Sequence, residues 1–87
     1  MLNKLNTNEI IPIGKTVELI KTPEELGKLI RERRKAAKLT QKKVAALAGI
    51  GVRFLSELER GKPTSHLGKT LKVVQLLGLE VHINERS

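Results

Sequence analysis

Apolar residues recur with a helical period between residues 22 and 37, and a helix start precedes them. Thr22 is suited to cap the first turn, and Pro23 suits the first helical position, where its missing amide hydrogen has no partner. Glu25 stands where a capping box places its acid. The apolar face of this expected helix consists of residues at helical spacing: Leu26, Leu29, Ile30 and Ala37.

A second pattern, between residues 39 and 61, predicts two short helices joined by a tight turn. Thr40 is a good N-cap for the first of them, and Gly49 stands where a helix end favours a left-handed residue. Gly61 is expected to end the second helix. The apolar faces are expected to consist of Val44, Leu47 and Ala48 in the first helix, and of Leu55 and Leu58 in the second. Two such helices across a glycine-containing turn predict a helix-turn-helix.

The pattern changes again beyond Gly61. Thr64 or Ser65 is expected to start a fourth helix, which Gly78 ends. Its core face consists either of Leu67, Leu71, Val74 and Leu77 or of Val73 with Leu77. Residues 79–84 alternate apolar and polar side chains, which predicts a six-residue strand. A single strand needs a partner edge, and either its copy in a second subunit or the region around Val17 would supply one.

Composition narrows the class of protein. A chain of 87 residues forms one small domain, and with Phe54 as its one aromatic residue the core must be aliphatic. The absence of cysteine excludes disulfides and thiolate metal sites and permits a reducing cytoplasm. His66 and His82 stand alone, so no metal or cofactor is expected. No apolar run has the length of a membrane span, and no signal peptide is expected.

The charge points to an anionic partner. Lys and Arg number 17 against nine acidic residues, and the formal net charge is +8. Such a surplus favours either polyanions or an acidic protein surface, and composition alone does not choose between them. Between Lys28 and Lys43, eight basic residues accompany a single acidic one, Glu32. This basic helical face is either a solvated surface or one that lies near a nucleic-acid backbone.

One set of residues within the helix-turn-helix resembles a known family. These residues are Thr40-Gln41, Ala45, Gly49, Leu55-Ser56 and Leu58-Glu59-Arg60-Gly61. At this spacing they resemble the XRE family of helix-turn-helix domains, which includes Cro and the phage repressors, and the similarity covers roughly Leu26 to Leu79. It implies an all-α DNA-binding domain of four to five helices, similar to lambda repressor, over residues 22–78. Residues 1–21 would form an N-terminal arm, partly disordered or a short strand. Residues 79–87 would form a C-terminal dimerisation strand and tail.

The third helix of such a domain presents its first residues to base edges in the major groove. The candidates here are Gly51, Val52, Arg53 and Ser56. The guanidinium of Arg53 matches the O6 and N7 acceptors of guanine, Val52 offers apolar contact to a thymine methyl, and Ser56 suits any base or a phosphate. Many relatives carry a polar residue at the position of Gly51 and glutamine at that of Val52. Specificity would therefore depend on Arg53 and on DNA shape.

Phosphate contacts are expected at the N-terminus of the second helix, where free amides and the helix dipole favour an anion. The candidates are Thr40, Gln41 and Lys42, together with Lys62 in the turn after the third helix. Gln41 could instead share the cap with Thr40, and Lys42 and Lys62 could be ordinary surface lysines. The resemblance also implies a structural ion pair between Arg34 and Glu59. Phe54 is expected either to pack against helix ends or to lie in a dimer seam.

The C-terminal strand narrows the resemblance to the HipB-type antitoxins, whose strands pair across a homodimer. Leu79, Val81 and Ile83 would then be the dimerisation residues. The resemblance implies a cytoplasmic, nucleoid-associated repressor that binds an inverted-repeat operator through recognition helices about 34 Å apart. It also implies that the protein represses its own operon and neutralises a HipA-like serine/threonine kinase toxin. The N-terminal arm either stays flexible or packs on the partner subunit or toxin.

Two alternatives remain open. The chain could be a stand-alone XRE-type regulator without a toxin, or a protein-binding adaptor whose basic face never contacts DNA. The sequence contains no catalytic triad, no paired acids suited to a pocket and no glycine-rich phosphate loop. We therefore do not expect an enzyme.

Overall fold

Four helices follow one another in the computed structural model, which describes residues 19–85 of the chain. They are α2 (Pro23–Ala36), α3 (Gln41–Ala48), α4 (Val52–Glu59) and α5 (Leu67–Leu76). The all-α prediction is confirmed for these residues. The predictions for residues 1–18 lie outside the described part of the chain, and Leu19 to Lys21 lead into α2 without regular secondary structure.

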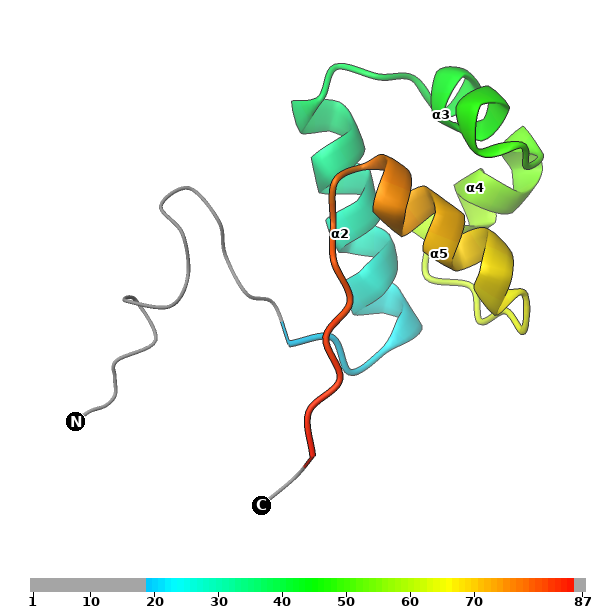
Figure 1. Ribbon diagram of the computed structural model, residues 1–87. Helices are drawn as coiled ribbons and strands as arrows, with labels where there is room; N and C mark the ends of the chain where they lie inside the picture. The colour runs from blue at the N-terminus through cyan, green and yellow to red at the C-terminus, as the bar shows by residue number, and fades with distance from the viewer. Residues whose placement is uncertain (1–18, 86–87) are drawn as a thin grey trace.

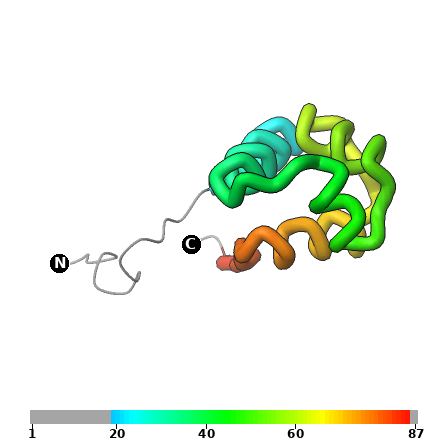
Figure 2. The backbone as a smooth tube through the Cα atoms, turned by 90° about the horizontal axis from the view of Figure 1, so that it is seen from above, coloured from blue at the N-terminus to red at the C-terminus, as the bar shows by residue number. Residues whose placement is uncertain are grey.

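The helices surround a single core (Figure 1). α4 packs against α2, and α3 packs against both α4 and α5. Viewed from above, α2 and α5 lie on opposite sides of the body, and α3 and α4 close one end (Figure 2). Short α3 and α4 therefore lie next to each other with their connecting turn at the surface, which is the arrangement of a helix-turn-helix.

Capping residues determine where the helices begin and end. The Thr22 hydroxyl accepts a hydrogen bond from the Glu25 amide at 3.1 Å, and the Glu25 carboxylate accepts one from the Thr22 amide at 3.1 Å, which completes a capping box. The Thr40 hydroxyl accepts from the Lys43 amide at 3.0 Å. Gly49 and Gly61 follow the ends of α3 and α4 with left-handed φ angles of 71° and 86°. Glycine adopts such angles readily, whereas residues with a side chain disfavour them.

The core is aliphatic, as its composition predicts. Its largest fully buried side chains are Ile30, Leu55, Val44 and Val73. Burying side chains of this size is favourable by roughly 1.5–3 kcal/mol each. Because the domain is small, these few residues contribute much of the apolar stabilisation.

Two predicted helix faces need correction. Leu47 is 54% exposed, and Ala45 is buried beside Val44 and Ala48 instead. The buried face of α3 is thus rotated toward Ala45, because both α4 and α5 pack on that side of this short helix.

The fourth helix also differs from the prediction. It begins at Leu67 rather than at Thr64 or Ser65, and Leu67 is 66% exposed. The side chains that α5 and its C-cap bury are Thr70, Val73, Val74 and Leu77. The Thr64 hydroxyl accepts a hydrogen bond from the His66 amide at 3.0 Å, so this residue stabilises the turn before the helix.

The predicted strand at 79–84 is absent from the described chain, in which residues 79–85 have no regular secondary structure. Leu79 packs against the core, and its amide donates to the Val74 carbonyl at 3.0 Å. Val81 and Ile83 are 59% and 92% exposed. A strand needs a second edge for its backbone hydrogen bonds, and no segment between residues 19 and 85 provides one.

Candidate nucleic-acid interface

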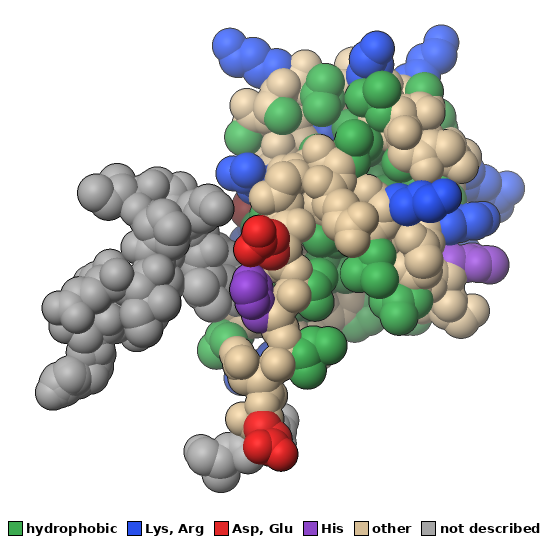
Figure 3. Space-filling model, in the orientation of Figure 1, with side chains coloured by type: hydrophobic (Ala, Val, Ile, Leu, Met, Phe, Trp, Pro, Cys, Tyr) green, Lys and Arg blue, Asp and Glu red, His purple; other side chains and the backbone are tan. Residues whose placement is uncertain are grey.

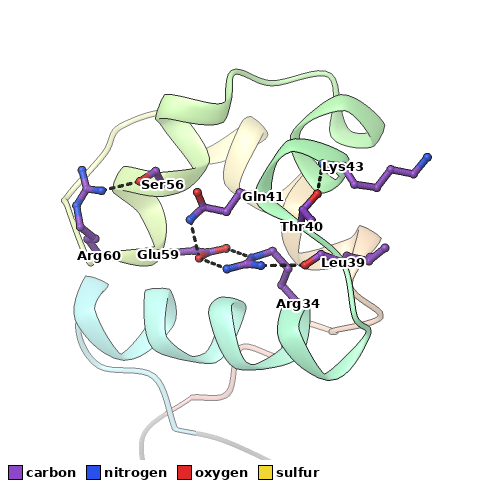
Figure 4. A network of polar contacts seen from close by, with 8 residues as sticks. All are labelled: Arg34, Leu39, Thr40, Gln41, Lys43, Ser56, Glu59 and Arg60. Carbon is purple, nitrogen blue, oxygen red and sulfur yellow. Dashed lines mark hydrogen bonds and ion pairs between the residues drawn. The ribbon is translucent and has the colours of Figure 1, made fainter.

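Arg34, Gln41 and Glu59 form a polar network that joins three helices (Figure 4). Arg34 of α2 donates through Nε and Nη2 to the two Glu59 oxygens, at 2.6 and 3.0 Å. Its Nη1 donates to the Leu39 carbonyl at 2.9 Å. Gln41 Nε2, from α3, donates to Glu59 Oε1 at 3.0 Å. One carboxylate on α4 therefore fixes the positions of α2 and α3, through a two-pronged contact that also fixes its own orientation.

The two charged groups of this network are buried, so each depends on the other for its counter-charge. The Arg34 and Glu59 side chains are 10% and 2% exposed. Burial favours a raised pKa for Glu59, but hydrogen bonds from Arg34 and Gln41 outweigh it and leave the pKa of Glu59 below its ordinary value. The hydrogen bond to Glu59 raises the pKa of Arg34. Both groups thus stay charged at neutral pH.

The N-terminus of α3 presents amides at the surface. The first backbone amides of a helix have no hydrogen-bond partner within the helix. Here the Thr40 hydroxyl accepts a hydrogen bond from the Lys43 amide. Lys42 and Lys43 are exposed, whereas Gln41 is half-buried and its amide nitrogen is directed at Glu59. Cap formation here thus uses Thr40, and Gln41 instead connects the helix end to the core network. No sequence pattern indicates this second contact of Glu59.

The start of α4 is open to solvent. Gly51 is its N-cap, and no atom lies within 4 Å of where a Cβ would stand on this residue. Val52 is 44% exposed, and the Arg53 side chain is 92% exposed. Ser56 is half-buried, and its hydroxyl accepts a hydrogen bond from Arg60 Nη1 at 2.6 Å. The structure thus brings all four candidate base-contacting residues to one helix end, three of them exposed.

Glu57 stands beside them on α4, one turn after Arg53. Its Oε2 lies 3.5 Å from Arg53 Nε and 3.3 Å from Lys62 Nζ. A hydrogen bond from Lys62, with the charges of Lys62 and Arg53, holds the pKa of Glu57 below its ordinary value. The i, i+4 spacing of Arg53 and Glu57 could have suggested the first contact. The contact with Lys62 depends on the loop that follows α4.

Basic side chains project from several sides of the helical body. In the space-filling view, Lys and Arg side chains project from the top and right of the helical body (Figure 3). Phe54 of α4 is half-buried, and its ring packs against the start of α5: it meets the His66 ring edge-on at 6.0 Å, and Lys69 Nζ lies 5.4 Å from its centre. Between residues 19 and 85, no group of three or more acidic, His or Cys side chains is placed to hold a metal ion.

Comparison with known proteins identifies the family. The helix-turn-helix family model matches residues 30–82. This chain belongs to that helix-turn-helix family. An uncharacterized HTH-type transcriptional regulator, y4mF of Sinorhizobium fredii, is 48% identical over 64 residues, which cover 74% of this chain and 84% of the relative. The family prediction is therefore confirmed, and the chain is a member of a regulator family rather than an enzyme.

Solved helix-turn-helix structures share the fold. The HipA-HipB-O2-O3 complex matches with a TM-score of 0.73 at 22% identity, over 82% of this chain and 100% of the other. The HipB-O4 20mer complex matches with a TM-score of 0.72 at 22% identity, with the same coverage. The restriction-modification controller protein C.AhdI from Aeromonas hydrophila matches at 0.61 and 31% identity, over 67% of this chain and 88% of the other. At 22% identity the HipB likeness concerns the fold alone.

Proposed function

We propose that this protein is a homodimeric, sequence-specific DNA-binding repressor of its own operon. The observation that carries the proposal is the exposed start of α4, where 92% of the Arg53 side chain is open to solvent. The α4 end would enter the major groove while Thr40, Lys42 and Lys62 contact phosphates. The net charge of +8 would supply sequence-independent attraction, and Arg53 the base-specific part.

The dimer in this proposal depends on the C-terminal segment. Val81 and Ile83 are exposed apolar residues that alternate with polar ones, next to the partly buried Leu79. Pairing of two such segments would satisfy their backbone groups and cover both side chains at once. Two copies would then present their α4 helices to the two halves of an inverted repeat.

The test is a binding titration on the DNA upstream of the chain's own gene. Wild type and Arg53→Ala are compared on this duplex and on a scrambled one, at two salt concentrations. We expect wild type to prefer the native duplex and Arg53→Ala to lose that preference. Equal, weak binding of wild type to both duplexes would contradict sequence-specific recognition and favour the adaptor alternative.

We propose further that the repressor is the antitoxin of a type II toxin-antitoxin module and neutralises a HipA-like kinase. The fold shared with HipB over that chain's full length and the alternating C-terminal segment support this step. The test is co-expression with the neighbouring gene product. A stable complex that suppresses kinase toxicity is expected, and a neighbouring gene unrelated to kinases would contradict it.

A restriction-modification controller is the second candidate. The C.AhdI structure has a lower TM-score than the HipB complexes but a higher identity, 31% against 22%. A methyltransferase or endonuclease gene beside this one, with regulation of that gene by the protein, would favour this candidate over the antitoxin.

A further inference from the structure

Glu57 is the single carboxylate of the helix-turn-helix region that remains at the surface. Between residues 41 and 78 the chain has two acidic residues, Glu57 and Glu59. Glu59 is buried and engaged by Arg34 and Gln41, whereas Glu57 lies one turn after Arg53 on the exposed side of α4. A carboxylate here repels phosphate, so it does not contribute to general affinity for DNA.

Two cations lie close to this carboxylate. Arg53 Nε and Lys62 Nζ both approach Oε2, at 3.5 and 3.3 Å. The Lys62 amide also donates to the Glu57 carbonyl at 3.0 Å, which fixes the start of the loop beside the helix. The Glu57 side chain is 23% exposed, against 92% for Arg53. Part of this carboxylate is therefore accessible to a hydrogen-bond donor.

The arrangement matches the edge of a particular base. In the major groove, cytosine presents an N4 amino donor, whereas guanine presents two acceptors. A carboxylate accepts from the first and is repelled by the second. Residues i and i+4 lie about 6 Å apart along a helix axis, within two base-pair steps of about 3.4 Å. Arg53 and Glu57 can therefore contact base pairs that lie within two steps of each other.

We propose that Glu57 is a specificity-determining residue, which orients Arg53 toward guanine and accepts a hydrogen bond from the N4 amino group of a cytosine within two base-pair steps. The inference rests on the proposed function, since it describes the same DNA interface. Through repulsion, the carboxylate also lowers affinity for duplexes that place guanine or thymine at the cytosine position.

The test uses the full chain and a set of operator duplexes, each with one half-site base pair changed. Wild type is compared with Glu57→Gln, Glu57→Asp and the control Glu85→Gln, which removes an exposed carboxylate outside the helix-turn-helix. For Glu57→Gln, we expect discrimination at one C·G position to fall on the order of tenfold. Its affinity for scrambled DNA should stay equal or rise, because a negative charge is lost.

Glu57→Asp separates charge from geometry. It keeps the charge but withdraws the carboxylate by one methylene group, so we expect wild-type affinity for scrambled DNA and reduced discrimination at the same position. Thermal unfolding of each variant verifies that it is folded.

Three outcomes decide the matter. A position-specific loss that is absent from Glu85→Gln supports the proposal. Unchanged discrimination in folded Glu57→Gln, or an equal affinity gain on every duplex, overturns it while operator recognition stands. If wild type prefers no duplex, the proposed function itself fails, and the role of Glu57 fails with it.

Discussion

Gly27 of α2 lies directly against the carbonyl oxygen of Leu58 in α4. A Cβ at Gly27 would stand 2.8 Å from the carbonyl oxygen of Glu59 and closer still to that of Leu58, shorter than Cβ contacts in proteins. The absence of a side chain thus lets α2 approach the backbone at the end of α4, two helical turns before Arg34 meets the Glu59 carboxylate.

Gly27→Ala should destabilise the fold by roughly 1–3 kcal/mol, since the neighbours are backbone atoms that cannot move aside cheaply. Gly68→Ala in α5 is the matched control, because no atom lies within 4 Å of its Cβ position. There we expect a gain of roughly 0.5–1 kcal/mol from helix propensity. Urea unfolding of both variants measures the difference, and similar midpoints would refute the close-contact explanation.

Glu59→Ala should lower stability far more than Glu57→Ala. It leaves the buried Arg34 guanidinium without its counter-charge, which costs roughly 3–5 kcal/mol. Glu57 forms only surface contacts with exposed Arg53 and Lys62, so its loss should change the melting temperature little. Thermal unfolding followed by circular dichroism gives both values. Equal shifts would show that the buried pair does not stabilise the fold.

Stability should fall in acid. The pKa of Glu59 is lower in the folded chain than its ordinary value of 4.5, so its ionised form stabilises the fold above that pH. This contribution is lost as the pH falls from about 4.5 through the lowered folded-state pKa. Unfolding midpoints measured from pH 7 to pH 3 should therefore decline, and Glu59→Gln should be less stable at pH 7 with a flatter decline. An equally steep decline in that variant would assign the acid sensitivity to other groups.

Lys42→Ala and Arg53→Ala should weaken DNA binding in different ways. Loss of a phosphate contact at Lys42 should lower affinity for all duplexes alike and reduce the slope of log K against log salt by about 1. Loss of Arg53 should cost about 1–3 kcal/mol on the operator and less on scrambled DNA. Titrations at several salt concentrations distinguish the two patterns. A sequence-dependent effect of Lys42→Ala would place that residue at a base instead.

Ile83→Asp should weaken self-association. Ile83 is 92% exposed in the single chain, and a charge there opposes its burial between two copies. Analytical ultracentrifugation should show dimeric wild type and a largely monomeric variant with an unchanged circular dichroism spectrum. Glu85→Gln, two residues along, is the control and should remain dimeric. A dimeric Ile83→Asp variant would place the interface elsewhere.

The sequence is a good guide where structure depends on neighbours in the chain. Thr22, Thr40 and Gly49 carry their signals within one helical turn, and the structure uses them as caps. It is a poorer guide where packing decides. The exposure of Leu47 depends on which side of α3 its neighbours cover.

Two features of the site could not be predicted from the sequence for the same reason. The contact of Gln41 with Glu59 joins residues 18 positions apart, and Gly27 is required only because α4 crosses α2 there. Neither has a periodic or local signature. The position of Lys62 beside Glu57 depends likewise on the course of a loop.

The network of Arg34, Gln41 and Glu59 has a consequence for genetics. In a cell in which this chain silences a promoter, mutants that lose silencing should fall into two classes. Alleles at Arg34 or Glu59 should be temperature-sensitive and yield little protein, because they unfold the domain that presents Arg53. Alleles at Arg53 should be defective at every temperature while the protein accumulates normally. Measuring silencing at two growth temperatures and protein level by immunoblot would then distinguish mutants that unfold the domain from mutants that lose a DNA contact.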